Sequence, residues 1–270
     1  MISPSQVAVT PRRRLRIAMG TWVAIEATAD YPPVVAAAID AAFDAIADIE
    51  RWMHPQLETS DLAKLNRCDI GWPVVVRAWT WELLALAQRV NQLSDGVFDP
   101  CLPSRPGRMP DIELTFDRTV VCWAPVALDF GGIAKGYAVD RAVDVLIAHG
   151  CRSGLVNAGG DLKVFGPYPE AILLRRPGGT LGPLDVCNAA LAVSDVDSCQ
   201  QPAEHRGYYV RGKREPLQCR YAAVLAPQAA TADALVKCVL LCAESDAQRV
   251  LREFDASCID KRGAGDCSQE

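Results

Sequence analysis

Apolar side chains recur every three or four residues in five segments of the chain, which is the period of helices that bury one face. The first helix should begin after Pro32-Pro33 and end at His54-Pro55, because proline is tolerated in a first turn but ends a helix further along. Ser245 and Gln248 have the spacing of a capping box at the start of the last helix. The pattern predicts helices over about residues 33–53, 77–93, 135–149, 230–242 and 245–254.

Stretches rich in β-branched and aromatic residues alternate with these segments and predict strands. They cover about residues 15–28, 113–116, 119–123, 127–130, 154–157, 161–165, 171–174, 185–194, 208–210, 221–225 and 257–259. The order of the elements favours the α+β class, with mixed sheets and packed helices. Because no repeat or linker divides the chain, we expect one domain over residues 16–260, an N-terminal arm over residues 1–15 and a C-terminal tail over residues 261–270.

The composition is that of a globular chain with a sizeable core, since 50% of the 270 residues are hydrophobic and 23% are charged. This excludes disorder over most of the length, because disordered chains lack the apolar surface that offsets the entropy of ordering. A net charge of -5 argues against a nucleic-acid partner, which would require a basic surface. The one basic cluster, Arg12, Arg13, Arg14 and Arg16, is expected in the solvated N-terminal arm.

The sequence predicts a cytoplasmic protein that is not inserted in a membrane. It has no run of about 18 apolar residues, and its N-terminal arginines follow the apolar residues, whereas an export signal begins with its charges. The cysteines number 11, are scattered and are never spaced Cys-x-x-Cys, and with only 3 histidines they offer no zinc-ligand set. We therefore expect most thiols to be small core residues.

Residues 128–140, Leu-Asp-Phe-Gly-Gly-Ile-Ala-Lys-Gly-Tyr-Ala-Val-Asp, combine a strand, a turn at Gly131-Gly132 and the start of a helix. A helix N-terminus presents unpaired N–H groups and the positive end of the helix dipole, which favours phosphate, and Lys135 adds a cation there. The spacing is neither that of a Walker loop nor Gly-x-Gly-x-x-Gly. The residues alone leave two interpretations open, a phosphate-binding turn or an ordinary tight turn.

Two further segments, Asn157–Asp161 and Asp95–Pro100, contain glycines next to polar or aromatic side chains. Paired glycines allow the backbone to approach a ligand or another strand closely. In isolation, however, each segment is most typical of an ordinary hairpin, bulge or helix-ending loop.

Taken together and in this order, these segments resemble the ApbE family, the FAD:protein FMN transferases. The family's Asp-x-Gly-Gly-Ile-Ala-Lys-Gly-Tyr-Ala-x-Asp corresponds to residues 129–140, and its Asn-Ala-Gly-Gly-Asp to residues 157–161. The other similar segments are Met19-Gly20-Thr21, Ser60–Asn66, Gly96–Pro100, Val224–Pro227 and Ala232–Leu235. The resemblance extends from about residue 16 to about residue 260.

The resemblance implies an ApbE-like, T-fold-like architecture and a magnesium-dependent enzyme. Such an enzyme takes FAD as substrate, releases AMP and attaches FMN through its phosphate to a threonine or serine of a flavin-accepting protein. The catalytic positions correspond to Asp233 and Lys135, and the Mg²⁺ ligands to the carbonyl of Gly132 and the carboxylate of Asp233. The positions that contact FAD correspond to Met19, Val97, Phe98, Asp99, Asp129, Gly131, Gly132 and Lys135.

Three positions depart from the family pattern. Gln56 replaces a tyrosine that stacks on the flavin, and an amide offers far less stacking area than a phenol ring. A His-x-Ile-Asp-Pro motif has no counterpart, and Gly207–Arg211 stand at its aligned position. Lys237 replaces a hydroxyl at the third metal-ligand position, four residues after Asp233. Either these two form a surface ion pair, or the ammonium stands where the metal usually sits, which predicts weak magnesium binding.

Two alternatives to a transferase remain open. One is a non-catalytic flavin- or nucleotide-binding protein that retains the fold and the Lys135 turn. The other is an FAD pyrophosphatase, which forms FMN and AMP and needs no pocket for an acceptor. The retained motifs favour a bound nucleotide in every case, while the three departures favour reduced activity.

Overall fold

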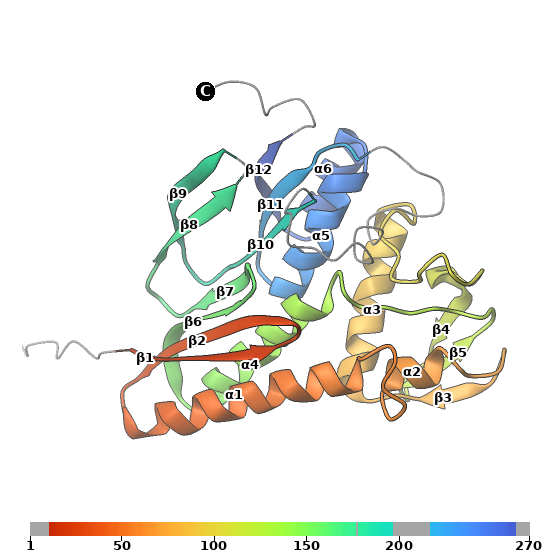
Figure 1. Cartoon of the computed structure of the whole chain (residues 1–270), viewed down its shortest axis with the longest axis horizontal. Coiled ribbons are helices and arrows are strands. Elements are labelled where there is room, and N and C mark those ends of the chain that lie inside the picture. The colour runs from red at the N-terminus through yellow and green to blue at the C-terminus, as the bar shows by residue number, and fades with distance from the viewer. Residues whose placement is uncertain (1–10, 177, 197–216, 263–270) are drawn as a thin grey trace, which may run out of the picture.

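The computed structural model describes residues 11–176, 178–196 and 217–262, and it confirms the expected α+β class (Figure 1). Its main sheet has seven strands in the order β1-β2-β6-β7-β10-β11-β12, and every neighbouring pair is antiparallel. The strands are β1 (Arg12–Ala18), β2 (Thr21–Ala29), β6 (Cys151–Ala158), β7 (Asp161–Phe165), β10 (Ala190–Asp195), β11 (Tyr221–Ala226) and β12 (Ser257–Arg262).

Helices cover one face of this sheet and a hairpin covers part of the other. The helices are α1 (Pro33–Trp52), α4 (Ala134–Ala148) and α5 (Ala229–Leu241), and α6 (Glu244–Glu253) packs against α5 and β12. On the opposite face, β8 (Glu170–Arg176) and β9 (Gly179–Val186) pack against β7 and β10 through a small apolar cluster (Figure 1). The sheet is therefore buried on both faces around β7.

A second part of the molecule lies at the C-terminal end of α1 (Figure 1). It contains α2 (Asp61–Leu65), α3 (Ala78–Leu93), the short 3-10 helix η1 (Met109–Asp111) and a sheet of β3 (Pro73–Val75), β5 (Thr119–Cys122) and β4 (Ile112–Leu114), in that strand order. One hydrophobic core includes residues from this part, such as Leu83 and Val120, together with residues of the main sheet, such as Ile25.

The helix periodicity read from the sequence is confirmed. In α1, Val35, Ile39, Phe43 and Ile49 are buried, and Pro33 occupies the first turn as expected. The predicted helices over residues 77–93, 135–149, 230–242 and 245–254 correspond to α3, α4, α5 and α6, with bounds that differ by at most one residue. Local periodicity sufficed for a helix such as α1, which buries one face, whereas α5 is buried on all sides from Ala229 to Leu240.

Several strand predictions are wrong in their bounds. The expected strand over residues 15–28 is the β1–β2 hairpin, because Met19 and Gly20 turn the chain with φ of 53° and 69°. Residues 127–130 form no strand and make only an isolated bridge between Leu128 and Cys101. The expected strand over residues 185–194 is divided between β9 and β10. The expected strand over residues 208–210 lies outside the described residues.

The termini of the domain also differ from expectation. Residues 12–15, expected in the N-terminal arm, belong to β1, where Arg14 and Arg16 form ion pairs with Asp40 of α1. At the other end, β12 continues to Arg262. The expected capping box at Ser245 is wrong, because α6 begins at Glu244 after Ala243 and has no side-chain cap.

The junction of α4 and α5 holds the helix layer together. Asp140 of α4 accepts hydrogen bonds from the first two backbone N–H groups of α5, those of Ala229 and Ala230, at 3.0 and 2.8 Å. Its Oδ1 also accepts from Lys163 Nζ at 2.8 Å. At Gly136, a Cβ would lie only 2.1 Å from the carbonyl oxygen of Ala229. The two helices therefore require both a capping carboxylate from α4 and a glycine at their closest approach.

We expect Gly136→Ala to lower the free energy of unfolding by about 1–3 kcal/mol, the usual effect of overpacking a close contact. The added methyl group would meet backbone that cannot rotate away. The measurement is urea denaturation followed by circular dichroism. Gly132→Ala is the matched control, because the nearest atom to its Cβ is 3.7 Å away. Equal stability of the two variants would contradict the close α4–α5 contact.

Candidate functional site

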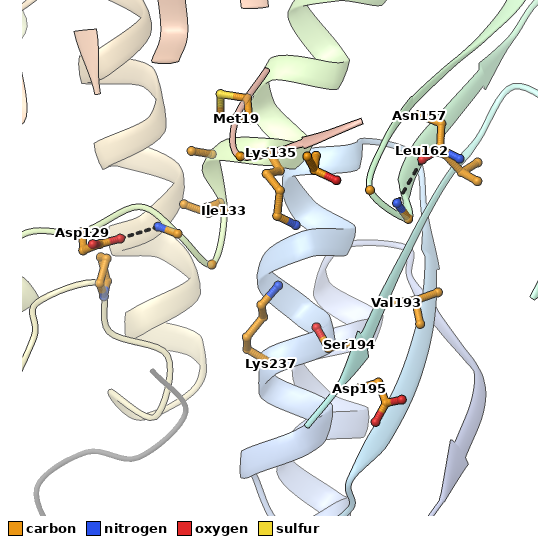
Figure 2. A pocket seen from close by; sticks show the side chains of 18 of the residues that line it. Met19, Asp129, Ile133, Lys135, Asn157, Leu162, Val193, Ser194, Asp195 and Lys237 are labelled. Carbon is orange, nitrogen blue, oxygen red and sulfur yellow. Dashed lines mark hydrogen bonds between the residues drawn. The ribbon is translucent and has the colours of Figure 1, made fainter. Parts of the chain in front are cut away.

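A cavity of about 1520 Å³ opens beside the N-terminus of α4, between the two parts of the molecule. Figure 2 shows its side chains converging from the β1–β2 turn, the turn before α4, α5 and the ends of β6, β7 and β10. The segments that line it include Met19–Thr21, His54–Pro55, Val97–Pro100, Asp129, Gly131–Lys135, Asn157, Gly159–Gly160, Leu162, Val193–Asp195 and Lys237.

The turn before α4 forms one wall of the cavity. Asp129 Oδ1 accepts a hydrogen bond from Gly131 N at 2.7 Å, and the carbonyl of Phe130 accepts from Ile133 and Ala134. The N-cap residue Ile133 makes no side-chain capping bond, and Asp233 Oδ2 accepts from Gly136 N in the first turn of α4. The residues from Gly131 to Lys135 line the cavity. This arrangement favours an anion at the helix N-terminus, as expected from the sequence.

Two glycine turns meet at a second wall. Gly159 N donates to the carbonyl of Trp22 at 3.2 Å, and a Cβ on Gly159 would lie 2.5 Å from Thr21 Oγ1. Asn157 Oδ1 accepts from Gly160 N at 2.9 Å and fixes the β6–β7 turn (Figure 2). The segments Met19–Thr21 and Asn157–Asp161 thus belong to one structural unit.

The segment that follows α3 supplies a third wall. Asp95 and Gly96 have φ of 50° and 75°, which turns the chain sharply after the helix. The carbonyl of Phe98 accepts from Asn91 Nδ2 at 2.6 Å, and Ser94 Oγ accepts from the N–H of Phe98 at 3.0 Å. These bonds hold Phe98 and its neighbours against the cavity.

Two lysines and two aspartates form a buried charge cluster, the lysine–aspartate cluster, made of Lys135, Asp161, Asp233 and Lys237. Lys135 Nζ pairs with Asp161 Oδ2, and Lys237 Nζ pairs with Asp233 Oδ1. Both carboxylates are buried, whereas both lysines line the cavity. Figure 2 shows the ammonium ends of Lys135 and Lys237 extending toward one another.

The two carboxyl groups of the cluster titrate in opposite directions. Burial raises the pKa of Asp161, and the charge of Asp233 raises it further against the lowering effect of Lys135 and Lys237. Burial also opposes ionisation of Asp233, but Lys237 and Lys135 hold its pKa below the ordinary value. Asp161 Oδ1 is buried and has no hydrogen-bond partner among the described residues, which fits a carboxyl group whose ionised form is disfavoured.

The cluster does not fit the magnesium ion that the resemblance implies. Magnesium requires nearly octahedral oxygen ligands at about 2.0–2.1 Å. Asp233 Oδ1 holds Lys237 and Oδ2 accepts from Gly136 N at 3.1 Å, so both oxygens are engaged. Over the described ranges, no group of three His, Cys, Asp or Glu side chains is suited to a metal. An ammonium about 4 Å from Mg²⁺ would repel it by about 8 kcal/mol at an effective dielectric constant of 20.

The sequence-predicted residues fall into three groups. The eight at FAD-contacting positions all line the cavity, and so does Lys237: Met19, Val97, Phe98, Asp99, Asp129, Gly131, Gly132, Lys135 and Lys237. Asp233 is buried beneath Lys237 and does not line the cavity. The surface ion pair considered for Asp233 and Lys237 is wrong, because the pair is buried. Gln56 is exposed and lies outside the lining, although His54 and Pro55 belong to it.

Asp161, Asp140 and Asn66 make contacts that the sequence did not predict, although each belongs to a segment that resembles the family. Asp161 follows the paired glycines of residues 157–161 and binds Lys135. Asn66 uses its side-chain amide to pair with the backbone of Leu128, with Nδ2 donating at 3.0 Å and Oδ1 accepting at 2.6 Å. Each of these polar residues is the last residue of its motif, which marks it as a candidate. Its role could not be predicted because its partner is distant in the sequence.

Comparison with known families supports the resemblance. The sequence model described as the ApbE family matches residues 19–104 and 108–259 of this chain. The matched ranges contain every segment that lines the cavity.

Two curated relatives are both named FAD:protein FMN transferase. The one from Treponema pallidum (strain Nichols) is 26% identical over 185 residues, which cover 57% of this chain and 51% of the relative. The one from Rhodobacter capsulatus is 32% identical over 106 residues, which cover 38% of this chain and 20% of the relative. The matched region thus spans about half of the first relative and a smaller share of the second.

Solved structures show the same fold. The Pseudomonas stutzeri flavinyl transferase ApbE, in its apo form, has a TM-score of 0.75 at 17% identity and covers 90% of this chain and 88% of its own. The Thermotoga maritima ApbE protein has a TM-score of 0.73 at 23% identity, with 93% and 94% covered. The flavin transferase ApbE from Vibrio cholerae has a TM-score of 0.75 at 18% identity, with 92% of each chain covered.

We expect Asp161→Asn to change how stability depends on pH. A carboxyl group with a raised folded pKa contributes stability below its ordinary pKa of 3.8 and loses it as pH rises through the folded pKa. The amide does not titrate, so the free energy of unfolding of the variant should increase relative to wild type from about pH 4 toward neutrality. Urea denaturation at several pH values measures this difference.

Asp44→Asn is the control for this prediction, because Asp44 is exposed on α1. Its stability is measured over the same pH range as a reference for a surface aspartate. The same pH dependence in both variants, relative to wild type, would mean that the pKa of Asp161 is not raised.

Proposed function

The chain belongs to the ApbE family, and on this basis we propose that it is a flavinyltransferase with FAD as its substrate. It would transfer FMN from FAD to a threonine or serine hydroxyl of a flavin-accepting protein and release AMP. One observation carries the proposal. The eight residues at FAD-contacting positions come from three separate segments, yet all of them line one cavity.

The arrangement of the cavity supports a dinucleotide substrate. Figure 2 shows Lys135 and Lys237 near the middle of the lining, which also includes apolar side chains such as Met19, Ile133, Leu162 and Val193. FAD likewise combines a charged diphosphate with two flat ring systems. Apolar walls that flank a few placed polar groups are typical of small-molecule sites.

In the proposed reaction the acceptor hydroxyl oxygen attacks the phosphorus of the FMN half. The bond from this phosphorus to the bridging oxygen breaks, AMP leaves with that electron pair, and the hydroxyl proton is released to solvent. Lys135 and Lys237 would donate hydrogen bonds to the phosphate oxygens and stabilise their charge. Asp161 and Asp233 would orient these lysines, and no step requires a metal ion at Asp233 or Gly132.

The acceptor that we propose is a protein in the cytoplasm. The cysteines in the described part of the chain are free thiols, and six of them are buried, as expected for small core residues. In the described residues, no helix is both long and apolar enough to cross a membrane. An acidic chain with a net charge of -5 also favours a protein acceptor over nucleic acid.

The test is incubation of the purified protein with FAD and a cytoplasmic extract, followed by denaturing electrophoresis and nucleotide chromatography. Transfer predicts a flavin-fluorescent protein band that survives denaturation, together with an equal amount of AMP. AMP together with free FMN, and no fluorescent band, would identify a pyrophosphatase. Unchanged FAD that is released only on denaturation would identify a non-catalytic binding protein.

We expect Lys135→Ala to weaken FAD binding by about 1.5–3 kcal/mol, the range for hydrogen bonds to charged groups. The variant removes the ammonium that faces the cavity beside the N-terminus of α4. Isothermal titration calorimetry with FAD and with AMP measures the loss. Lys64→Ala is the control, because Lys64 lies on α2 and outside the cavity lining. Unchanged FAD affinity in Lys135→Ala would remove Lys135 from the phosphate site.

A further inference from the structure

Lys237 occupies the centre of the position at which the family resemblance places a divalent ion. Its Nζ pairs with Asp233 Oδ1, and its Cε would lie 3.7 Å from a Cβ on Gly132. The lysine thus packs between the two residues, Gly132 and Asp233, that correspond to metal ligands. Its side chain is only 11% exposed, so most of it is packed against neighbouring residues.

Both oxygens of the Asp233 carboxylate, which lies beneath Lys237, already have partners. Asp233 is 0% exposed, and its second oxygen accepts from the backbone N–H of Gly136. A divalent ion could reach this carboxylate only by displacing an ammonium that the buried charge itself stabilises. The fold therefore holds Lys237 in place from both sides, through Asp233 of the same helix and through the turn before α4.

Two lysine side chains from different helices therefore place their ammonium groups at the cavity. Lys135 comes from α4 and is held by Asp161, and Lys237 comes from α5 and is held by Asp233. The joined helices place both ammonium groups on one side of the cavity (Figure 2). Two ammonium groups that face one space can each donate to a different phosphate of a diphosphate.

We propose that Lys237 is a built-in counter-ion for a diphosphate diester, so that the cavity binds its nucleotide without a divalent cation. This inference rests on the proposed nucleotide-binding function and specifies how the site holds the substrate. The ligand class is a nucleoside diphosphate diester such as FAD or ADP-ribose, which has one negative charge on each phosphate. Lys135 and Lys237 match these two charges.

The experiment is calorimetric titration of FAD and, separately, ADP-ribose into the purified protein, in EDTA and in millimolar magnesium. Wild type should bind with affinities that agree within about twofold in the two buffers. The positive charge that balances the diphosphate belongs to the side chain of Lys237, so it is present with or without magnesium. Lys237→Thr should bind about 10- to 150-fold more weakly than wild type in EDTA, the effect of losing one charge-assisted hydrogen bond. Magnesium should restore much of the loss in this variant, because a hydroxyl then stands beside a free carboxylate.

Direct metal binding provides a second readout that needs no nucleotide. Titration with Mn²⁺, monitored by electron paramagnetic resonance, should show no bound ion in wild type and one bound ion in Lys237→Thr. Lys261→Thr is the matched control, because Lys261 pairs with Glu244 on the surface and should behave as wild type in every titration. Circular dichroism checks the fold of each variant, and the wild-type comparison between the two buffers stands without any variant.

The outcomes separate this inference from the proposed function. Magnesium-independent binding of ADP-ribose without binding of FAD would support the lysine site and contradict a flavin substrate. A wild-type affinity that rises tenfold or more with magnesium, stoichiometric Mn²⁺ binding by wild type, or binding of neither ligand would overturn the inference. Equal affinities of wild type and Lys237→Thr in EDTA would also overturn it, because Lys237 would then not contact the ligand.

Discussion

The capping of α5 by Asp140 is the interaction on which the rest of the site depends. A helix N-terminus needs acceptors for its first N–H groups, and α5 obtains two of them from a carboxylate on α4, with no side-chain cap of its own. Lys163 from β7 neutralises the same carboxylate at 2.8 Å. One buried side chain thus ties two helices and the central sheet together, and Gly136 allows the helices to approach closely enough for this to happen.

The charge cluster follows from this junction. Asp233 lies one turn into α5 and accepts a hydrogen bond from Gly136, the residue after Lys135. Asp161 begins β7, two residues before Lys163, so it faces the helix layer as Lys163 does. When α4, α5 and β7 pack together, Lys135 lies beside Asp161 and Lys237 lies beside Asp233. Burying two carboxylates is tolerable only because each has an ammonium beside it.

The sequence predicted the parts of this arrangement that depend on local pattern. The period of α1 and the glycine turn before α4 were readable because neighbouring residues determine them. The pairing of Lys135 with Asp161 was not, because it requires β7 to lie beside α4. The turn at Met19 and Gly20 was also missed, since a single glycine inside an apolar stretch does not distinguish a hairpin turn from a continuous strand. The spacing of Asp233 and Lys237 shows that they share one face of a helix. It does not show that other helices cover this face, so the burial of the pair could not be predicted.

The contact between Thr21 and Gly159 has a consequence for synthesis of the chain on the ribosome. β2 pairs with β6, whose residues are translated more than a hundred positions later, and the sheet cannot close before they emerge. In the meantime the edge of β2 that β6 will cover is unpaired, and such an edge is prone to pair with other nascent chains. Glu26 places a charge on that edge strand, and α1, which follows directly, can pack against β2 from one face. The helix that follows the hairpin thus covers one of its faces before β6 is translated, while the charge of Glu26 disfavours wrong pairing at the edge of β2.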